Sequence, residues 1–192
     1  MKKKSAALML LALCAFLLTG CASDQEAAPF TVMILDTYID PAAVDAYAAA
    51  LPEELGAKVL SLSMGDEKTD PMSRVAGTTA LTAHIAAQEV DIVIAPREMI
   101  AGTARGECFF APEEFLSADQ IAQIAEDREI RFEILDDDLN PTGALTPVYG
   151  VDVTGHESLL GSFGEDSVGV YVVGNTTHPE AAAAFFMELI GQ

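Results

Sequence analysis

The feature that most constrains the fold is an alternation of strand-like and helix-like segments over residues 30–95. Residues 30–36 (FTVMILD) form a continuous apolar run of strand length, as expected for a strand that is buried on both faces. Residues 58–63 (KVLSLS) and 91–95 (DIVIA) are two further segments of strand length. Because strands that alternate with helices favour a parallel sheet with right-handed crossovers, this block predicts a βαβαβ core.

Two helices are predicted between these strands, and both have the same start signal. Asp40 and Asp70 are each followed by proline; the aspartate can cap free amides, and proline fits the first helical turn. We expect Gly56 to end the first helix region. The first helix is expected to bury Val44, Tyr47, Ala48 and Leu51. The second helix is expected to bury Met72, Val75, Ala76, Thr79, Ala83 and Ala86.

The pattern is weaker after Ala95. Residues 96–116 contain several glycine and proline breaks and predict a surface excursion with at most one short helical turn. Ser117 and Gln120 have the spacing of a capping box before a short helix. Residues 130–135 (IRFEIL) alternate apolar and polar positions, which indicates a strand with one wet face, at an edge or antiparallel.

The chain ends in a strand, a turn and a helix. Residues 167–173 (SVGVYVV) predict a buried strand, and Asn175 suits the turn because asparagine tolerates left-handed backbone angles. Thr177 and Glu180 have capping-box spacing at the helix start. The apolar face of this helix is expected to consist of Ala182, Phe185, Phe186 and Ile190. The predicted fold is a single-lobed three-layer α/β sandwich, residues 29–192, with a mostly parallel sheet.

The N-terminus looks like an export signal. Three lysines at positions 2–4 precede an uncharged apolar run, residues 6–18, that is too short to span a bilayer. Residues 18–21 (LTGC) closely resemble the lipobox of bacterial lipoproteins. The resemblance implies a signal peptide over residues 1–20 and an acylated (palmitate-bearing) Cys21, followed by a polar tether over residues 21–28. It also implies a cell-membrane protein, anchored in the lipid bilayer and facing the extracytoplasmic side.

Charge limits the partners. Ten basic and thirty acidic residues give a net charge of −20, and loss of the signal lysines makes the mature chain more negative still. Such a field repels nucleic acid, phosphates and anionic lipid, and it attracts cations. We therefore expect no nucleic-acid partner. A solvated acidic surface that keeps the protein soluble explains the same composition.

Neither the histidines nor the remaining cysteine predict catalysis. His84, His156 and His178 lie in a helix, a loop and a helix start, and no nucleophile elbow is present. Cys108 is the only cysteine outside the signal and the acylation position, so no internal disulfide is expected. Its acidic and aromatic neighbours favour a small buried thiol over a nucleophile. We expect the protein not to be an enzyme and to need no cofactor.

An acidic turn at residues 136–143 invites a calcium interpretation. Asp136, Asp138 and Asn140 have the alternate spacing of the first ligands in a calcium loop. The sixth position is Pro141 rather than glycine, and the twelfth is Pro147 rather than a bidentate glutamate. A solvated turn is therefore favoured, with weak calcium binding left open and no metal site predicted.

Three passages resemble the extracellular solute-binding proteins of bacterial uptake systems, which have the type 2 periplasmic-binding fold. They are the opening βαβαβ block, the segment DIVIAPREMI at residues 91–100, and YGVDVTG followed by the closing strand and helix. The resemblance implies small-molecule binding linked to transport, with a membrane permease as partner. Family members are much longer and have two lobes, so this chain is expected to be reduced to one. A lipoprotein that serves as a scaffold for another envelope protein is the alternative.

Open parallel sheets bind ligands beyond the carboxyl ends of their strands. A polar small molecule is expected to meet a carboxylate from Asp36, a stacking ring from Tyr38 and donors from Arg97. An equally acceptable role for Arg97 is an ion pair with a local acid. The complete set of candidate ligand-binding residues is Asp36, Thr37, Tyr38, Met64, Gly65, Pro96, Arg97 and Tyr149.

Overall fold

A computed structural model describes residues 28–156 and 167–191. The predicted signal peptide, Cys21 and all but the last residue of the tether lie outside this part of the chain. Within the described residues, no helix combines the length and the apolar character needed to cross a membrane.

The described elements are as follows. The strands are β1 (Thr31–Asp36), β2 (Lys58–Ser63), β3 (Ile92–Pro96), β4 (Glu129–Ile130), β5 (Glu133–Leu135), β6 (Pro141–Leu145), β7 (Gly150–Asp152) and β8 (Val168–Val172). The α-helices are α2 (Pro41–Ala50), α3 (Pro71–Ala86), α4 (Arg97–Arg105), α5 (Pro112–Phe115), α6 (Ala118–Ile121) and α7 (Pro179–Ile190). Short 3-10 turns cover Glu53–Leu55 and Glu126–Arg128.

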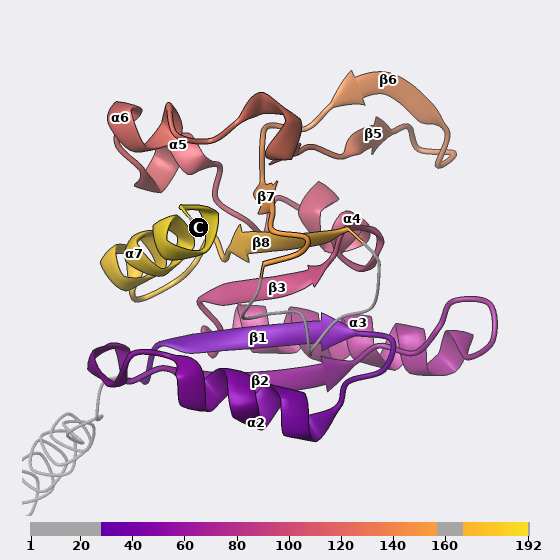
Figure 1. Ribbon diagram of the computed structural model, residues 1–192. Coiled ribbons are helices and arrows are strands. Elements are labelled where there is room, and N and C mark those ends of the chain that lie inside the picture. Colours follow the sequence, from indigo (N-terminus) through magenta and orange to yellow (C-terminus); the bar gives the residue numbers. More distant parts are fainter. Residues whose placement is uncertain (1–27, 157–166, 192) are drawn as a thin grey trace, which may run out of the picture.

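The central sheet has six strands in the order β2-β1-β3-β8-β7-β4 (Figure 1). β1 is parallel to β2 and β3, which confirms the βαβαβ block. β8 is antiparallel to β3, β7 to β8 and β4 to β7. The predicted mostly parallel sheet is therefore wrong, and the sheet is mixed. The C-terminal half adds strands antiparallel to their neighbours, and such strands need no helical crossover between them.

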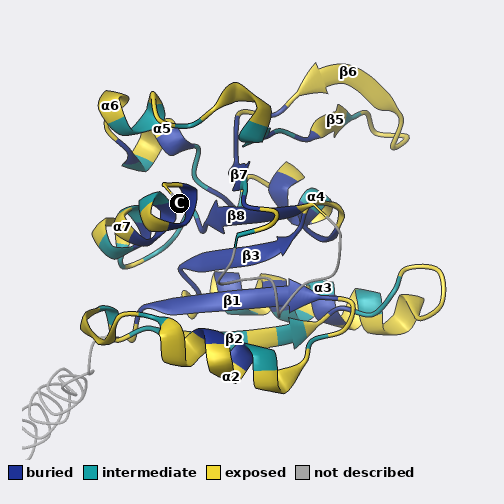
Figure 2. Ribbon diagram, in the orientation of Figure 1, coloured by how far each residue is buried: buried dark blue, intermediate teal, exposed yellow. Residues whose placement is uncertain are grey.

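The sheet lies between two helical layers, as predicted for a three-layer sandwich. Val32 and Ile34 of β1 share a core cluster with residues of α2 and α7. Met33 and Leu35 point to the opposite face and share a second cluster with residues of α3 and α4. All six residues of β1 are buried, because this strand is covered on both faces (Figure 2).

Both aspartate–proline helix starts are confirmed. The side chain of Asp40 accepts a hydrogen bond from the Ala42 amide at 3.0 Å, and that of Asp70 accepts one from the Ser73 amide at 3.2 Å. The α2 helix ends before a short 3-10 turn, and Gly56, in the left-handed conformation, ends that turn. Val44 and Tyr47 are the buried residues of α2, whereas Ala48 is exposed.

The buried face of α3 differs from the prediction. Gly77, Leu81 and Ile85 are buried, while Met72 and Val75 are 77% and 62% exposed. A Cβ at Gly77 would lie only 3.0 Å from the Met64 Cα, so the helix approaches the end of β2 where it has no side chain. This close approach turns Leu81 and Ile85 to the sheet. The whole predicted stripe (Met72, Val75, Ala76, Thr79, Ala83 and Ala86) faces outward.

The middle of the chain is more regular than predicted. In place of a loose excursion, α4 begins directly after β3, and its Met99, Ile100 and Ala104 lie in the core. The predicted strand over residues 130–135 is divided at Phe132. Its first part joins the main sheet as β4, and its second part pairs with β6 in a separate two-stranded sheet.

The final helix confirms its predicted apolar face but not its cap. Phe185 and Phe186 are 2% and 1% exposed and lie in the α2–α7 core. The N-cap residue is His178 rather than Thr177, and its side chain makes no capping hydrogen bond. Asn175 does not have a left-handed backbone. Its side-chain nitrogen donates instead to the carbonyl of Ile85, at the end of α3, at 2.7 Å.

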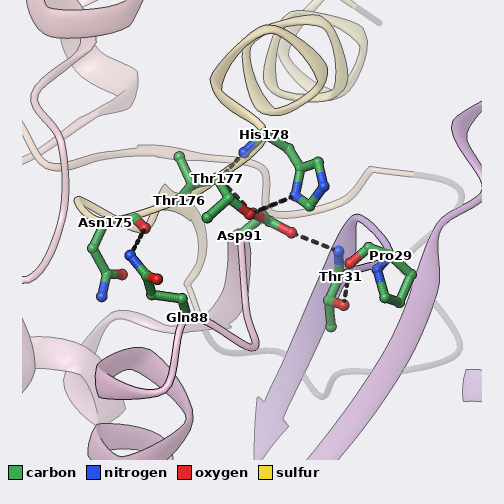
Figure 3. Close-up of polar contacts among 8 residues, drawn as sticks. All are labelled: Pro29, Thr31, Gln88, Asp91, Asn175, Thr176, Thr177 and His178. Carbon is green, nitrogen blue, oxygen red and sulfur yellow. Dashed lines mark hydrogen bonds and ion pairs between the residues drawn. The ribbon is translucent and has the colours of Figure 1, made fainter. Parts of the chain in front are cut away.

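A buried carboxylate connects the two ends of the described chain (Figure 3). Asp91 is 3% exposed, and its Oδ2 accepts a hydrogen bond from the Thr31 amide at 2.8 Å. Its Oδ1 accepts from the Thr176 hydroxyl and lies 3.1 Å from His178 Nδ1. One side chain thus joins the start of β1, the start of β3 and the turn before α7.

Tyr171, by contrast, buries a hydroxyl with no hydrogen-bond partner among the described residues. Tyr171→Phe is expected to stabilise the protein by about 1 kcal/mol, because it removes an unpaired buried polar group. Burial also raises the pKa of this phenol. As the pH rises, the Tyr171 phenol of the unfolded chain therefore loses its proton before that of the folded chain. The free energy of unfolding of the wild-type protein is unaffected by this below about pH 10 and falls above it. Urea unfolding of both proteins at pH 8 and pH 10.5 should show the advantage of the variant increasing; an advantage that shrinks with pH contradicts the argument.

Candidate functional site

The carboxyl ends of β1, β2 and β3 meet at one edge of the sheet, and a groove opens beside the last of them. The groove has a volume of about 410 Å³. Pro96 ends β3 and precedes the first turn of α4, so the strand delivers Arg97 directly to the groove. The lining residues are Pro96, Arg97, Glu98, Ala101, Arg105, Phe132, Glu133 and Ser167. We call this feature the edge groove.

Arg97 is held in the edge groove by two contacts. Its Nη2 donates to the main-chain carbonyl of Arg131, and its guanidinium carbon lies 5.8 Å from the centre of the Phe132 ring. No carboxylate of the described residues lies within ion-pair distance of Arg97, so the predicted alternative of a local ion pair is not found there. A guanidinium has five N–H donors, so one bond to a carbonyl leaves most of them for a ligand.

Arg105, which lies two turns after Arg97 on α4, provides a second cation. Its Nε donates to the carbonyl of Glu133 at 2.9 Å, and its side chain is exposed. Arg105 therefore fastens the start of β5 to α4, and Arg97 fastens the segment just before β5, while both keep other donors available. Phe132 and Glu133, at the start of the β5–β6 hairpin, form one wall of the edge groove.

The first turn of α4 contributes main-chain donors. Its N-cap residue, Pro96, makes no side-chain capping bond. The Arg97 amide donates to the carbonyl of Ser167 at 3.0 Å. The next amides belong to the group of first-turn N–H donors that a helix cannot satisfy internally. Uncapped helix starts of this kind attract anionic groups. Glu98 and Glu133 also line the groove, so it presents charges of both signs.

Only part of the predicted site reaches the edge groove. Pro96 and Arg97 line it. Asp36, the last residue of β1, and Thr37 and Tyr38 after it lie at the same edge of the sheet without lining the groove. Asp36 is 8% exposed, and its Oδ1 accepts a hydrogen bond from the Thr37 amide at 2.5 Å. Tyr38 is 77% exposed and does not stack in the groove.

Met64, Gly65 and Tyr149 are not part of the edge groove. Met64 is fully buried in the α3–α4 core. Gly65 has a φ of +67°, and a Cβ there would lie 2.7 Å from the Ser73 Cβ, so its role is to let the loop pass α3. Tyr149 lies at the other end of the sheet, because it directly precedes Gly150, which pairs with Tyr171 near the C-terminal end of antiparallel β8. The prediction that Tyr149 joins the site at this edge is therefore wrong.

Arg105 and Phe132 were not predicted as site residues. Arg105 lies two turns after Arg97 on α4, and identifying it requires knowing that this segment is a helix. The sequence predicts Phe132 as an inward-facing residue of one continuous strand. Its contact with the groove depends on the break between β4 and β5. The helical spacing of the two arginines is the signal in the sequence that could have identified Arg105.

The other chemical candidates have structural roles. Asp136 Oδ1 accepts hydrogen bonds from the amides of Asp138 and Asn140 at 2.9 and 2.8 Å, so this carboxylate closes the β5–β6 turn. Among residues 28–156 and 167–191, no group of three or more histidine, cysteine or acidic side chains is arranged to hold a metal ion. Cys108 is half-buried, and burial raises the pKa of its thiol, which disfavours the reactive thiolate.

Comparisons with protein-family models, with characterised proteins and with solved structures gave no match.

Proposed function

We propose that the protein is a membrane-anchored extracytoplasmic lipoprotein that binds a small polar solute with an acidic group in the edge groove, as part of an uptake system. The observation that carries the proposal is the convergence of Arg97, Arg105 and the start of α4, which has no side-chain cap among the described residues, on one groove. Guanidinium groups and free helix amides are the donors that proteins use for carboxylates. A groove of about 410 Å³ falls within the range of small-molecule sites.

The anchor is supported by sequence alone. The LTGC motif places Cys21 directly after a charged and apolar leader, and residues 21–28 are polar enough to act as a tether. Acylated Cys21 would keep the domain close to a permease in the same membrane. The strongly acidic surface would keep the domain away from anionic headgroups.

The β5–β6 hairpin supports binding without hinge closure. Hinge-closing binding proteins trap the ligand between two lobes. Here the second wall of the groove is the start of the hairpin. It is already attached to α4, by Arg105 at Glu133 and by Arg97 at Arg131, just before β5. Because both cations are exposed, each charge-assisted contact is screened by water. We therefore expect micromolar to millimolar affinity rather than the tight binding of a closed trap.

Thermal unfolding of the full chain in detergent, with pools of amino acids, dicarboxylates and short peptides, tests the proposal. One acidic pool should raise the unfolding temperature. Arg97→Gln and Arg105→Gln should each weaken the affinity for the active compound about tenfold, the loss of one charge-assisted contact.

Lys58→Gln is the matched control, because it removes the same charge at the other end of β1–β2 and should leave the affinity unchanged. Unfolding of the unliganded variants separates loss of binding from loss of the hairpin contacts. A folded protein that no pool stabilises, or a Lys58→Gln effect as large as that of Arg97→Gln, would overturn solute binding in this groove.

A protein-interaction scaffold is the second candidate, and one observation favours it. The outer face of α3 exposes Met72 and Val75 beside an apolar hollow of about 550 Å³. β2 at the sheet edge has no strand neighbour on its outer side within the described residues. The same thermal-unfolding experiment separates the candidates, because a scaffold predicts no stabilisation by any solute pool.

A further inference from the structure

A second and larger cavity lies at the opposite end of the sheet from the edge groove. It has a volume of about 630 Å³ and lies where β8 ends and β7 begins. We call it the β8-end cavity. Its lining residues are Ile85, Glu107, Cys108, Phe109, Phe110, Ala111, Glu114, Pro147, Tyr149, Gly174 and Asn175. The proposed solute site uses none of them.

Aromatic and aliphatic groups form the walls of the β8-end cavity. Phe109 is 3% exposed, and its ring lies 5.3 Å from the ring of Tyr171 in the core. Tyr149 is 7% exposed, and Phe110 and Pro147 complete the apolar surface. Phe109 is fixed further by an isolated bridge to Val173 at the end of β8. The walls are therefore preformed rather than assembled from mobile loops.

Two exposed carboxylates, those of Glu107 and Glu114, line the cavity together with Tyr149. Burial raises the pKa of Tyr149, and the charges of Glu107 and Glu114 raise it further. Glu114 also accepts a hydrogen bond from the Ala111 amide at 2.7 Å, which holds its carboxylate near the start of α5. The negative charge of Glu114 is thus held in a fixed position at the cavity.

All of these features select the same ligand chemistry. Among the described residues that line the cavity there is no lysine, arginine or histidine to neutralise Glu107 and Glu114. Aromatic faces attract a cation, and carboxylates pair with it. The net charge of −20 would also steer cations toward the protein. We propose that the β8-end cavity binds an organic ammonium ion with an apolar body.

The test compares 2-phenylethylamine with 2-phenylethanol, which have nearly the same shape and differ in charge at neutral pH. Calorimetric titration of the full chain in detergent should show at least tenfold tighter binding of the amine. The ring resonances of Tyr149 should shift on addition of the amine, which places the probe in this cavity.

Glu107→Gln combined with Glu114→Gln should abolish the preference for the amine. Glutamine keeps an acceptor for the Ala111 amide, so the start of α5 is preserved. Glu113→Gln is the matched control, because Glu113 is exposed on the same helix and does not line the cavity. It should leave the preference intact.

The proposal is overturned if the amine does not bind, if the alcohol binds equally well, or if the double variant keeps the preference. An equal loss in Glu113→Gln would also overturn it, since the effect would then be one of overall charge. Arg97→Gln should leave amine binding unchanged, so failure here and failure of the edge groove are distinguishable.

Discussion

Asp91→Ala is expected to lower the free energy of unfolding by about 4 kcal/mol, a large part of the stability of a domain of this size. The carboxylate is buried and bonds to Thr31, Thr176 and His178. Alanine would leave the Thr31 amide and the Thr176 hydroxyl without this acceptor in the core, and each unpaired buried donor costs about 1–3 kcal/mol. The loss would also free the start of β1 from the turn before α7.

Urea unfolding measures the effect, with Asp45→Ala as control. Asp45 lies exposed on α2, so its replacement changes the net charge equally and should alter stability by less than about 0.5 kcal/mol. Asp91→Asn keeps one acceptor oxygen and should fall between the two. If Asp91→Ala and Asp45→Ala unfold at the same urea concentration, the carboxylate does not fasten the chain as described.

Local signals in the sequence predicted the elements of the first half well. Continuous apolar runs marked β1 and β3, and Asp40 and Asp70 cap their helices as expected. These signals depend on residues close together in the chain. For the same reason they could not predict Asp91, which looked like the polar start of a strand and bonds to residues at both ends of the fold.

Features that depend on distant contacts were not predictable in this way. The outward stripe of α3 is as apolar as its buried face, and only the approach of Gly77 to Met64 decides which face is buried. The antiparallel placement of β7 and β8 moved Tyr149 away from the edge groove. Arg97 was identified because it follows β3 directly, whereas Arg105 required the unpredicted helix α4.

Gly150→Ala is expected to destabilise the protein by about 3 kcal/mol, because the new methyl group has no space. A Cβ at position 150 would lie 2.5 Å from two ring carbons of Tyr171 and 2.9 Å from the carbonyl oxygen of Val170. Tyr171 cannot move aside easily, since it is fully buried and its ring lies 5.3 Å from Phe109 and 6.3 Å from Phe132. The same ring approaches Gly169, so the glycines of β7 and β8 make room for one tyrosine.

Gly102→Ala gives the matched control for Gly150→Ala. Gly102 lies within α4, and a Cβ there meets nothing within 4 Å, so alanine should stabilise the helix by about 0.5–1 kcal/mol.

In a Tyr171→Leu background the cost of Gly150→Ala should fall, and the part that remains reports the contact with the Val170 carbonyl. An unchanged cost in that background would mean that the backbone, rather than the Tyr171 ring, requires glycine at position 150. The opposite signs of the two glycine-to-alanine substitutions would show that steric contact, and not the conformational freedom of glycine, sets the cost at position 150, and the Tyr171→Leu background assigns that contact to the ring or to the backbone.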